Sequence, residues 1–283
     1  MALPRIQLTL QDHKWAIARA WTILFIASGV LPIVLYFALR YGAHLAIGTV
    51  LAITTSIFGI VSFLALLMRS WALLKHDSEC RPLVGSRWAM DYFNWSFLAC
   101  FASVTALVVA GNVTKSIRLV ALGLPVILVA VCGQLLLAVL FKYNRILAPF
   151  TISSTLKGQP IRSGTYAITE DVVAVDGARG QTYRKQLEAR YFASHTVRRL
   201  FSQLDLLWGI SGVAAGGLTI GLSIGLEDES VAYVLGWTVP WAYAAIMAVA
   251  TTCLVRKSLI GEKEDEPSTL NELVESPDKR CAV

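Results

Sequence analysis

LLWGISGVAAGGLTIGLSIGL, residues 206–226, is the stretch that decides the fold. It carries no charged side chain, and about 20 apolar residues of helix cross the ~30 Å hydrocarbon core of a bilayer. Within lipid the backbone has to satisfy its own hydrogen bonds, so an apolar span of this length is helical. The stretch therefore predicts a transmembrane helix.

Small residues recur at four-residue spacing inside this helix. Gly217, Gly221 and Gly225 form one series, and Gly212 and Gly216 form a second pair. Glycines at this spacing let another helix backbone approach closely, which is how membrane helices associate. We expect tight helix packing along these faces; a glycine-lined substrate groove is the alternative interpretation.

Further apolar segments lie on both sides of this helix. The chain is 55% hydrophobic and only 16% charged, with a mean hydropathy of +0.60, which excludes an ordinary water-soluble domain. We expect six transmembrane helices in all, over Trp21–Leu39, His44–Met68, Phe93–Ala110, Leu119–Phe141, Leu206–Leu226 and Val231–Val255.

The distribution of basic residues predicts the orientation. With six spans, 22 of the 25 Lys and Arg residues fall on the side that carries both termini. Cytoplasmic segments are enriched in Lys and Arg, so both termini are expected in the cytosol. The membrane itself is expected to be that of the endoplasmic reticulum or another part of the secretory pathway. The expected organisation is a cytosolic tail (1–20), helices 1–4 (21–141), a cytosolic cap (142–205), helices 5–6 (206–255) and a disordered cytosolic tail (256–283).

The cap has the pattern of a small folded unit. Thr165–Thr169 and Val172–Asp176 resemble two strands joined at a Glu170-Asp171 turn. A basic amphipathic helix over 181–203 follows, and such helices bind anionic lipid headgroups. The predicted fold is thus an all-α membrane protein with six transmembrane helices and a small cytosolic α+β cap between helices 4 and 5.

Three aromatic residues of the last span form a candidate pocket. Tyr233, Trp237 and Trp241 lie four residues apart, so their rings share one helix face. One interpretation is an aromatic-lined substrate pocket. The other is an interfacial aromatic belt combined with ordinary packing.

Asn112-Val113-Thr114 matches the N-glycosylation acceptor pattern on the side opposite the termini. Asn112 is therefore a candidate glycosylation site.

No residue group has the spacing of a metal or cofactor site. Glu170, Asp171 and Asp176 are expected to be turn residues, and the acidic and thiol side chains at 76–80 lie too close in sequence to converge on one ion. The chain also lacks the basic and aromatic platform that binds single-stranded nucleic acid. We expect no metal, no cofactor and no nucleic-acid partner.

Three segments carry a resemblance to a known group: LPIVLYFALR (31–40), YAITEDVVAVDG (166–177) with YRKQLEARY (183–191), and VAYVLGWTVPW (231–241). Together they resemble a family of fungal multi-pass membrane proteins with no established activity. The resemblance implies an integral membrane protein of unknown molecular activity, accessory to a fungal secondary-metabolite pathway, with membrane or pathway proteins as partners. It transfers no catalytic residue.

Two alternatives stay open. A membrane-embedded, terpene-cyclase-like enzyme on an apolar substrate would need an acid at a helix end, with Asp91, Asp205 and Glu227 as candidates. A small-molecule transporter is the other. Buried charge within spans is the usual mark of such proteins, and here the spans carry little beyond Gln134, so a non-enzymatic protein is favoured.

Overall fold

The computed structural model describes residue 22 and residues 25–84 and 88–275, and this part of the chain is helical, with two isolated β-bridges and no strand. The helices run, in chain order, η2 (Ile26–Val30), α2 (Leu31–Phe37), η3 (Ala38–Gly42), α3 (Ile47–Leu74), α4 (Tyr92–Thr114), α5 (Ile117–Ala121), α6 (Gly123–Tyr143), α7 (Gly164–Val175), α8 (Gly180–Ala193), α9 (His195–Gly225) and α10 (Glu229–Glu275).

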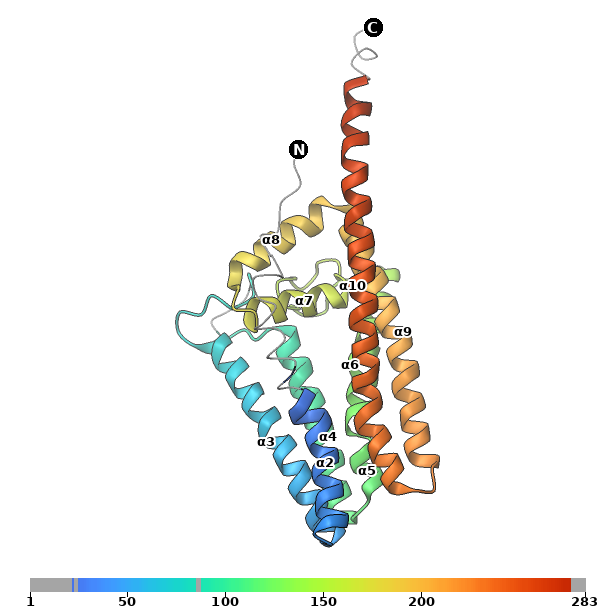
Figure 1. Cartoon of the computed structure of the whole chain (residues 1–283). Coiled ribbons are helices and arrows are strands. Elements are labelled where there is room, and N and C mark those ends of the chain that lie inside the picture. The colour runs from blue at the N-terminus through green and yellow to red at the C-terminus, as the bar shows by residue number, and fades with distance from the viewer. Residues whose placement is uncertain (1–21, 23–24, 85–87, 276–283) are drawn as a thin grey trace.

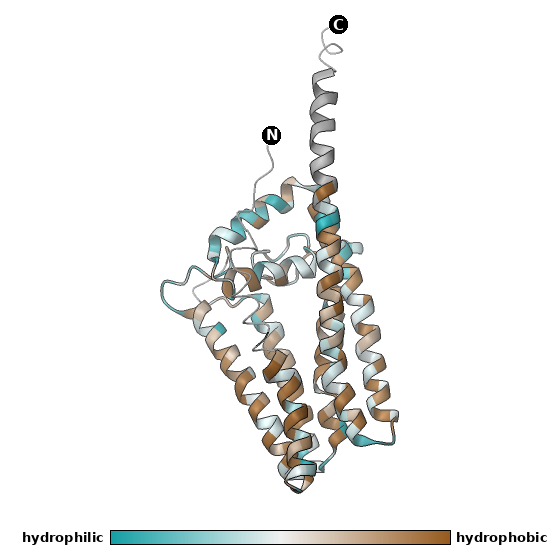
Figure 2. Ribbon diagram, in the orientation of Figure 1, coloured by the Kyte–Doolittle hydropathy of each residue, from teal (hydrophilic) through white to brown (hydrophobic). Residues whose placement is uncertain are grey.

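Five of the described helices are long and apolar enough to cross a membrane. They cover Ile47–Leu74, Tyr92–Thr114, Ile117–Tyr143, His195–Gly225 and Glu229–Ser258. Figure 2 shows the hydrophobic surface of these helices along the bundle, with hydrophilic residues gathered around α8 at one end. The helical architecture predicted from the sequence is confirmed, and the five helices are compatible with the predicted integral membrane protein.

The first expected span lies only partly within the described residues. The predicted segment began at Trp21, and the described apolar helix covers Ser28–Gly42, below the length of a full span. The predicted N-terminal tail, 1–20, lies outside the described residues. The structure therefore supports five spans and does not support the count of six.

The glycines of α9 divide into two faces. A Cβ added at Gly212 would lie 2.2 Å from Cys132 Sγ, and one at Gly216 would lie 2.7 Å from Val129 Cγ2, so this face seats directly on α6. Gly217, Gly221 and Gly225 have nothing within 4 Å of such a Cβ. Close helix approach thus occurs along one of the two predicted glycine series.

An aromatic core fills the end of the bundle far from α7. Tyr36 of α2 stacks on Tyr233 of α10 with ring centroids 4.4 Å apart, and Phe58 of α3 meets Trp237 edge-on at 5.1 Å. All four side chains are buried. Offset and edge-to-face contacts of this kind stabilise packing beyond the area they bury, so this cluster ties α2, α3 and α10 together.

The predicted hairpin in the cap is wrong. Residues 164–175 form the helix α7, which lies across the end of the bundle (Figure 1). Its buried positions, Tyr166, Ala167, Glu170, Asp171 and Ala174, recur three and four residues apart, which is the period of one helix face. Glu170 and Asp171 are therefore inward-facing helix residues rather than turn residues, and the cap is not α+β.

The predicted basic helix over 181–203 is two helices. It divides at Ser194, between α8 and α9, where the Ser194 hydroxyl accepts a hydrogen bond from the Val197 amide at 3.2 Å and so caps α9. The last helix, α10, continues through Glu275. It therefore extends into the segment 256–283, for which the sequence predicted disorder.

Candidate functional site

A buried ion network holds α7 and α8 against the bundle. Arg184 of α8 is fully buried, and its Nη1 lies 2.7 Å from Asp171 Oδ1 and 3.0 Å from Glu170 Oε1. Its Nη2 donates to the Cys80 carbonyl oxygen at 3.1 Å. A buried charge is tolerated only when it is paired and hydrogen-bonded, and these bonds supply both conditions.

A second arginine joins the network from α3. Arg69 Nη2 lies 2.7 Å from Asp91 Oδ2 and donates to the Asp171 carbonyl oxygen at 3.2 Å, and Nη1 pairs with Asp176. Asp91 is itself the N-cap of α4, because its Oδ1 accepts from the Asn94 amide at 2.8 Å. The network thus joins α3, α4, α7 and α8.

The network contains more carboxylates than guanidinium groups, which affects Asp171. Burial and, secondly, the nearby Asp91 carboxylate raise the pKa of Asp171 from 3.8 to about 7, although Arg184 opposes the shift. Burial alone would lower the pKa of Arg184, but Asp171 and Glu170 raise it above its ordinary value. Asp171 is therefore the group in this network whose charge changes near neutral pH.

The start of α7 is anchored separately, by a carboxylate from α9. Asp205 is buried and accepts hydrogen bonds from the Gly164 amide at 3.1 Å and from the Thr165 amide and hydroxyl, each at 2.7 Å. A carboxylate at this position satisfies the unpaired N–H groups of a helix start and complements its dipole. α7 is thus fixed at one end by α9 and along its length by the ion network.

Beneath α7 lies a cavity, which we call the α7 cavity. Its volume is about 470 Å³, and apolar side chains of α6, α9 and α10 form most of its wall, with Thr165, Ile168 and Thr169 of α7 above them. Trp241 and Thr251 of α10 complete the lining. Apolar cavities of this size with a few polar groups are typical of small-molecule sites.

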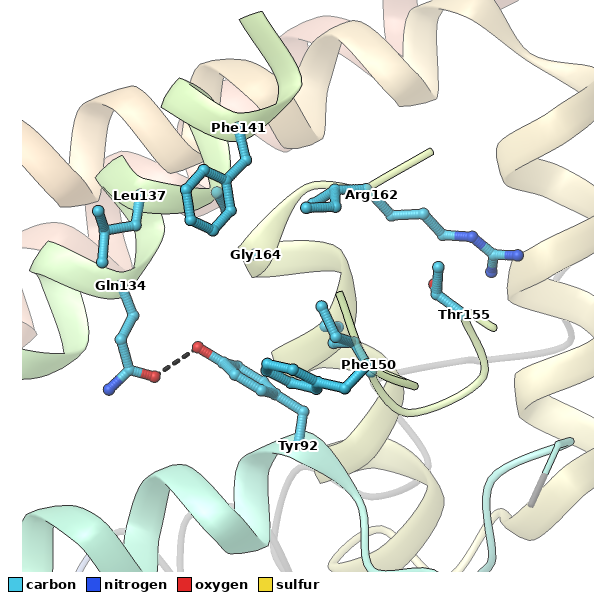
Figure 3. A pocket seen from close by; sticks show the side chains of 12 residues that line it. Tyr92, Gln134, Leu137, Phe141, Phe150, Thr155, Arg162 and Gly164 are labelled. Atoms are coloured by element: carbon cyan, nitrogen blue, oxygen red, sulfur yellow. Dashed lines mark hydrogen bonds between the residues drawn. The ribbon is translucent and has the colours of Figure 1, made fainter. Parts of the chain in front are cut away.

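A smaller cavity, the Gln134 pocket, lies on the other side of α7. It has a volume of about 210 Å³ between α4, α6, the 150–162 loop and the start of α7. Figure 3 shows Tyr92 of α4 and Gln134 of α6 pointing toward one another in its wall, joined by a hydrogen bond from the Tyr92 hydroxyl to Gln134 Oε1. Phe141 and Phe150 supply apolar surface, and Arg162 lies on the opposite side.

Residues 1–265 match the family described as a domain of unknown function, DUF8766. The chain belongs to the DUF8766 family. No curated protein and no solved structure matches the chain. The sequence resemblance predicted a family with no established activity, and the match to a domain of unknown function agrees with that. The match gives no support to a fungal origin.

The aromatic trio proposed from the sequence is split in this DUF8766 chain. Tyr233 and Trp237 are buried in the aromatic core, where Trp237 Nε1 has no hydrogen-bond partner. Trp241 is partly exposed, borders the α7 cavity and donates from Nε1 to the Ser28 carbonyl oxygen at 3.3 Å. Of the three, Trp241 is thus the one placed against the α7 cavity.

Asn112, the predicted glycosylation site, is engaged within the bundle. Its amide nitrogen donates to the Val108 carbonyl oxygen at 2.8 Å and to Thr55 Oγ1 at 3.2 Å. A glycan attached to this nitrogen would replace one of its two N–H hydrogens and so break one of these bonds, and the geometry of α4 therefore opposes modification there.

The candidate acids occupy three different settings. Asp91 and Asp205 are buried and fully engaged at helix starts, as described above, and neither lines the α7 cavity. Glu227 is exposed in the α9–α10 connection. Among the described residues no group of three or more His, Cys, Asp or Glu side chains is arranged to hold a metal ion.

Sequence reasoning missed the roles of Arg69 and Arg184. Arg184 was interpreted as part of a lipid-facing basic surface, yet it is buried, and Arg198 of the same surface donates to the Tyr191 and Phe192 carbonyl oxygens at 3.0 and 2.6 Å. The available signal was the helical spacing of Tyr166, Glu170 and Ala174, which places an acid on a buried face and so requires a cationic partner.

Proposed function

We propose that the chain is a non-enzymatic accessory protein of a membrane, which holds an apolar, lipid-like molecule in the α7 cavity. The observation that carries this proposal is the cavity itself: about 470 Å³ of mostly apolar volume, covered by a helix that is fixed at its start by Asp205 and along its length by the ion network. Rigidly preformed pockets bind without an ordering cost.

The chemistry of the lining favours holding over catalysis. Polar groups on the cavity wall are threonine hydroxyls, the Cys132 thiol and the Trp208 and Trp241 indoles. Both indole N–H groups already donate, Trp208 Nε1 to Thr251 Oγ1 at 2.9 Å and Trp241 Nε1 to the Ser28 carbonyl oxygen at 3.3 Å. Among the described lining residues there is no carboxylate or imidazole to act as a general acid or base. This favours an accessory protein over a cyclase that protonates an apolar substrate.

The cavity can be tested by filling it. Ala244 lines the α7 cavity, whereas Ala248, one turn further along α10, is exposed and outside it. We expect Ala244→Trp to reduce the co-purified apolar molecules, measured by mass spectrometry of the detergent-extracted protein, by about tenfold or more, which corresponds to ~1.4 kcal/mol. Ala248→Trp is the matched control. Equal recovery from both variants would refute the proposal.

We further propose six spans with both termini in the cytosol, which puts α7 and α8 on the cytosolic face. This rests on the 22 of 25 basic residues that six spans would place on one side. It rests also on the apolar Ser28–Gly42 helix, which would form the second half of the first span, on the side away from the termini. In a cysteine-free background, a cysteine at Thr114 should react only with reagent applied from the side opposite the termini. A cysteine at Lys157 is the control and should react from the cytosolic side.

The setting expected from the sequence resemblance, a secondary-metabolite pathway, stays a prediction. It is tested by comparing intracellular and secreted metabolites in host cells with and without the chain. An accumulated precursor would favour an enzyme, and a finished product retained in the cells would favour a transporter. A changed yield with neither effect is the result expected of an accessory protein.

A further inference from the structure

The connection between α6 and α7 exposes large apolar side chains beyond the end of a membrane-spanning helix. The span that includes α6 ends at Tyr143. We call the exposed apolar residues at and after this point the loop patch: Tyr143 (84% exposed), Ile146 (43%), Leu147 (54%), Phe150 (60%) and Leu156 (40%). Groups of exposed apolar side chains on a folded protein mark surfaces that bind a partner or a membrane.

The loop that carries the patch is held against the helices. Leu147 and Pro160 form an antiparallel β-bridge, which brings the two arms of the loop together. Near the tip of the loop, Ser153 Oγ donates to Asp171 Oδ2 at 2.5 Å and accepts from the Tyr92 amide at 3.0 Å. The loop is therefore anchored to α4 and α7, and its exposed apolar side chains are a fixed feature of the fold.

The patch continues the lipid-facing side of α6. Leu137 and Leu140 are 50% and 51% exposed and, with Tyr143, lie on one side of the helix because they are three residues apart. Large apolar side chains exposed along a membrane-spanning helix contact acyl chains. Leu147 and Phe150 follow Tyr143 by four and seven residues, so the patch begins where the lipid-facing side of α6 ends.

The charge of the segment favours an anionic lipid surface over an ordinary protein partner. Residues 142–163 include four Lys or Arg residues and no Asp or Glu. Of the four, Arg145 and Lys157 are exposed, whereas Arg162 pairs with Glu188 Oε1 at 2.7 Å. Basic residues interspersed with apolar and aromatic ones are typical of segments that lie in the headgroup layer of an anionic membrane.

We propose that the loop patch inserts into the headgroup layer of the bilayer beside α6, where Arg145 and Lys157 bind the phosphate groups of anionic phospholipids. The long stems of these side chains lie along apolar surface while their charged ends reach the phosphates. The site differs from the basic helix 181–203 that the sequence suggested, because α8 lies beyond α7 at the end of the bundle (Figure 1). The proposal depends on α6 crossing a membrane and does not depend on a ligand in the α7 cavity.

The insertion can be measured with the full chain in lipid bilayer discs. In a cysteine-free background, a single cysteine replaces Leu147 in the patch or Thr182, an exposed residue of α8, and carries a small fluorophore. Lipids with a nitroxide high on the acyl chain quench a fluorophore inside the bilayer, and iodide quenches one in water. We expect the label at 147 to be quenched by the nitroxide lipid and the label at 182 by iodide. Quenching of the label at 147 by iodide alone would overturn the proposal and leave the patch to a protein partner.

The choice of lipid is tested by comparing nitroxide-bearing phosphatidylserine with phosphatidylcholine that carries the same chain. One basic residue near an anionic surface contributes ~1 kcal/mol, so the label at 147 should favour the serine lipid at least about fivefold. Lys157→Glu should remove this preference. Lys185→Glu makes the same change in net charge at an exposed position of α8 and should leave the preference intact.

Two controls separate this proposal from the others. Both charge variants are at exposed positions, and a label at Leu156, on the other arm of the loop, should repeat the result obtained at 147. Ala244→Trp, which fills the α7 cavity, should change neither the quenching nor the lipid preference. Equal quenching by the serine and choline lipids, or an unchanged preference in Lys157→Glu, would overturn the binding of anionic phospholipid.

Discussion

The aromatic core at one end of the bundle and the ion network beneath the cap are both buried, but different forces hold them. Tyr36, Tyr233 and Trp237 pack as apolar rings from α2 and α10. The network instead buries Asp171 and Arg184, whose burial is favourable only while both partners are present. The core should therefore respond to changes of volume, and the network to changes of charge.

The largest expected effect is the loss of one charge from the network. Arg184→Met leaves Glu170 and Asp171 buried without their cation, and removal of one partner from a buried ion pair lowers the free energy of unfolding by about 3–5 kcal/mol. Thermal unfolding of the purified protein measures the loss. Lys185→Met, at the exposed neighbouring position of α8, is the control. Equal stability of the two variants would show that the network does not hold the cap.

A comparable loss of stability is expected when the aromatic core is altered, but this loss should not depend on pH. Trp237→Ala should lower the free energy of unfolding by about 3 kcal/mol, at the lower end of the range for this substitution, because the ring also borders an open cavity. The loss should be the same at pH 5 and pH 8, since no charge is removed. Trp71→Ala, at a position 73% exposed, should have little effect.

A smaller effect is expected where α9 meets α6. Gly216→Ala places a methyl group 2.7 Å from Val129 Cγ2 and 3.1 Å from the Pro125 carbonyl oxygen, and overpacking of this kind lowers stability by about 1–3 kcal/mol. Gly217→Ala, on the open face of the same helix, should be neutral or slightly stabilising, because alanine is the better helix former. Equal free energies of unfolding for the two variants would contradict the close contact of α9 with α6.

A last expected effect is a dependence on pH. The pKa of Asp171 is raised from 3.8 to about 7 in the folded protein, so the folded chain binds this proton more tightly than the unfolded chain does. The contribution of Asp171 to the free energy of unfolding therefore falls as pH rises from about 4 to about 7, and is constant above that. Asp171→Asn should flatten this part of the stability profile, measured by unfolding at several pH values. An unchanged profile would assign the titration to another group.

The bundle was predictable because its determinants are local. Each span is a continuous apolar segment, and the glycine series that contacts α6 is visible at Gly212 and Gly216. The cap was not, because Glu170 and Asp171 are typical turn residues when only their neighbours are considered. Their burial depends on Arg184 of the next helix, which pairs with both carboxylates, and the residues that flank Glu170 and Asp171 contain no information on such a partner.

The Gln134 pocket shows the same limit. A lone Gln in the middle of an apolar span is visible in the sequence, but its meaning depends on which of its atoms are already bonded. The hydroxyls of Tyr92 and Ser96 come from α4 and occupy only the oxygen of the amide. Which atoms of the amide are bonded is thus a result of tertiary structure.

The position of the ion network along the chain has a consequence for biosynthesis. Arg69 and Asp91 are 22 positions apart and can pair as soon as both have left the ribosome, whereas Asp176 is 107 positions after Arg69. At ~5–20 residues per second, the first pair waits about 4–17 s for the segment that completes it. During that interval the nascent protein presents an unfinished polar surface, so a chaperone or quality-control factor has a defined period in which to distinguish a completed chain from a truncated one.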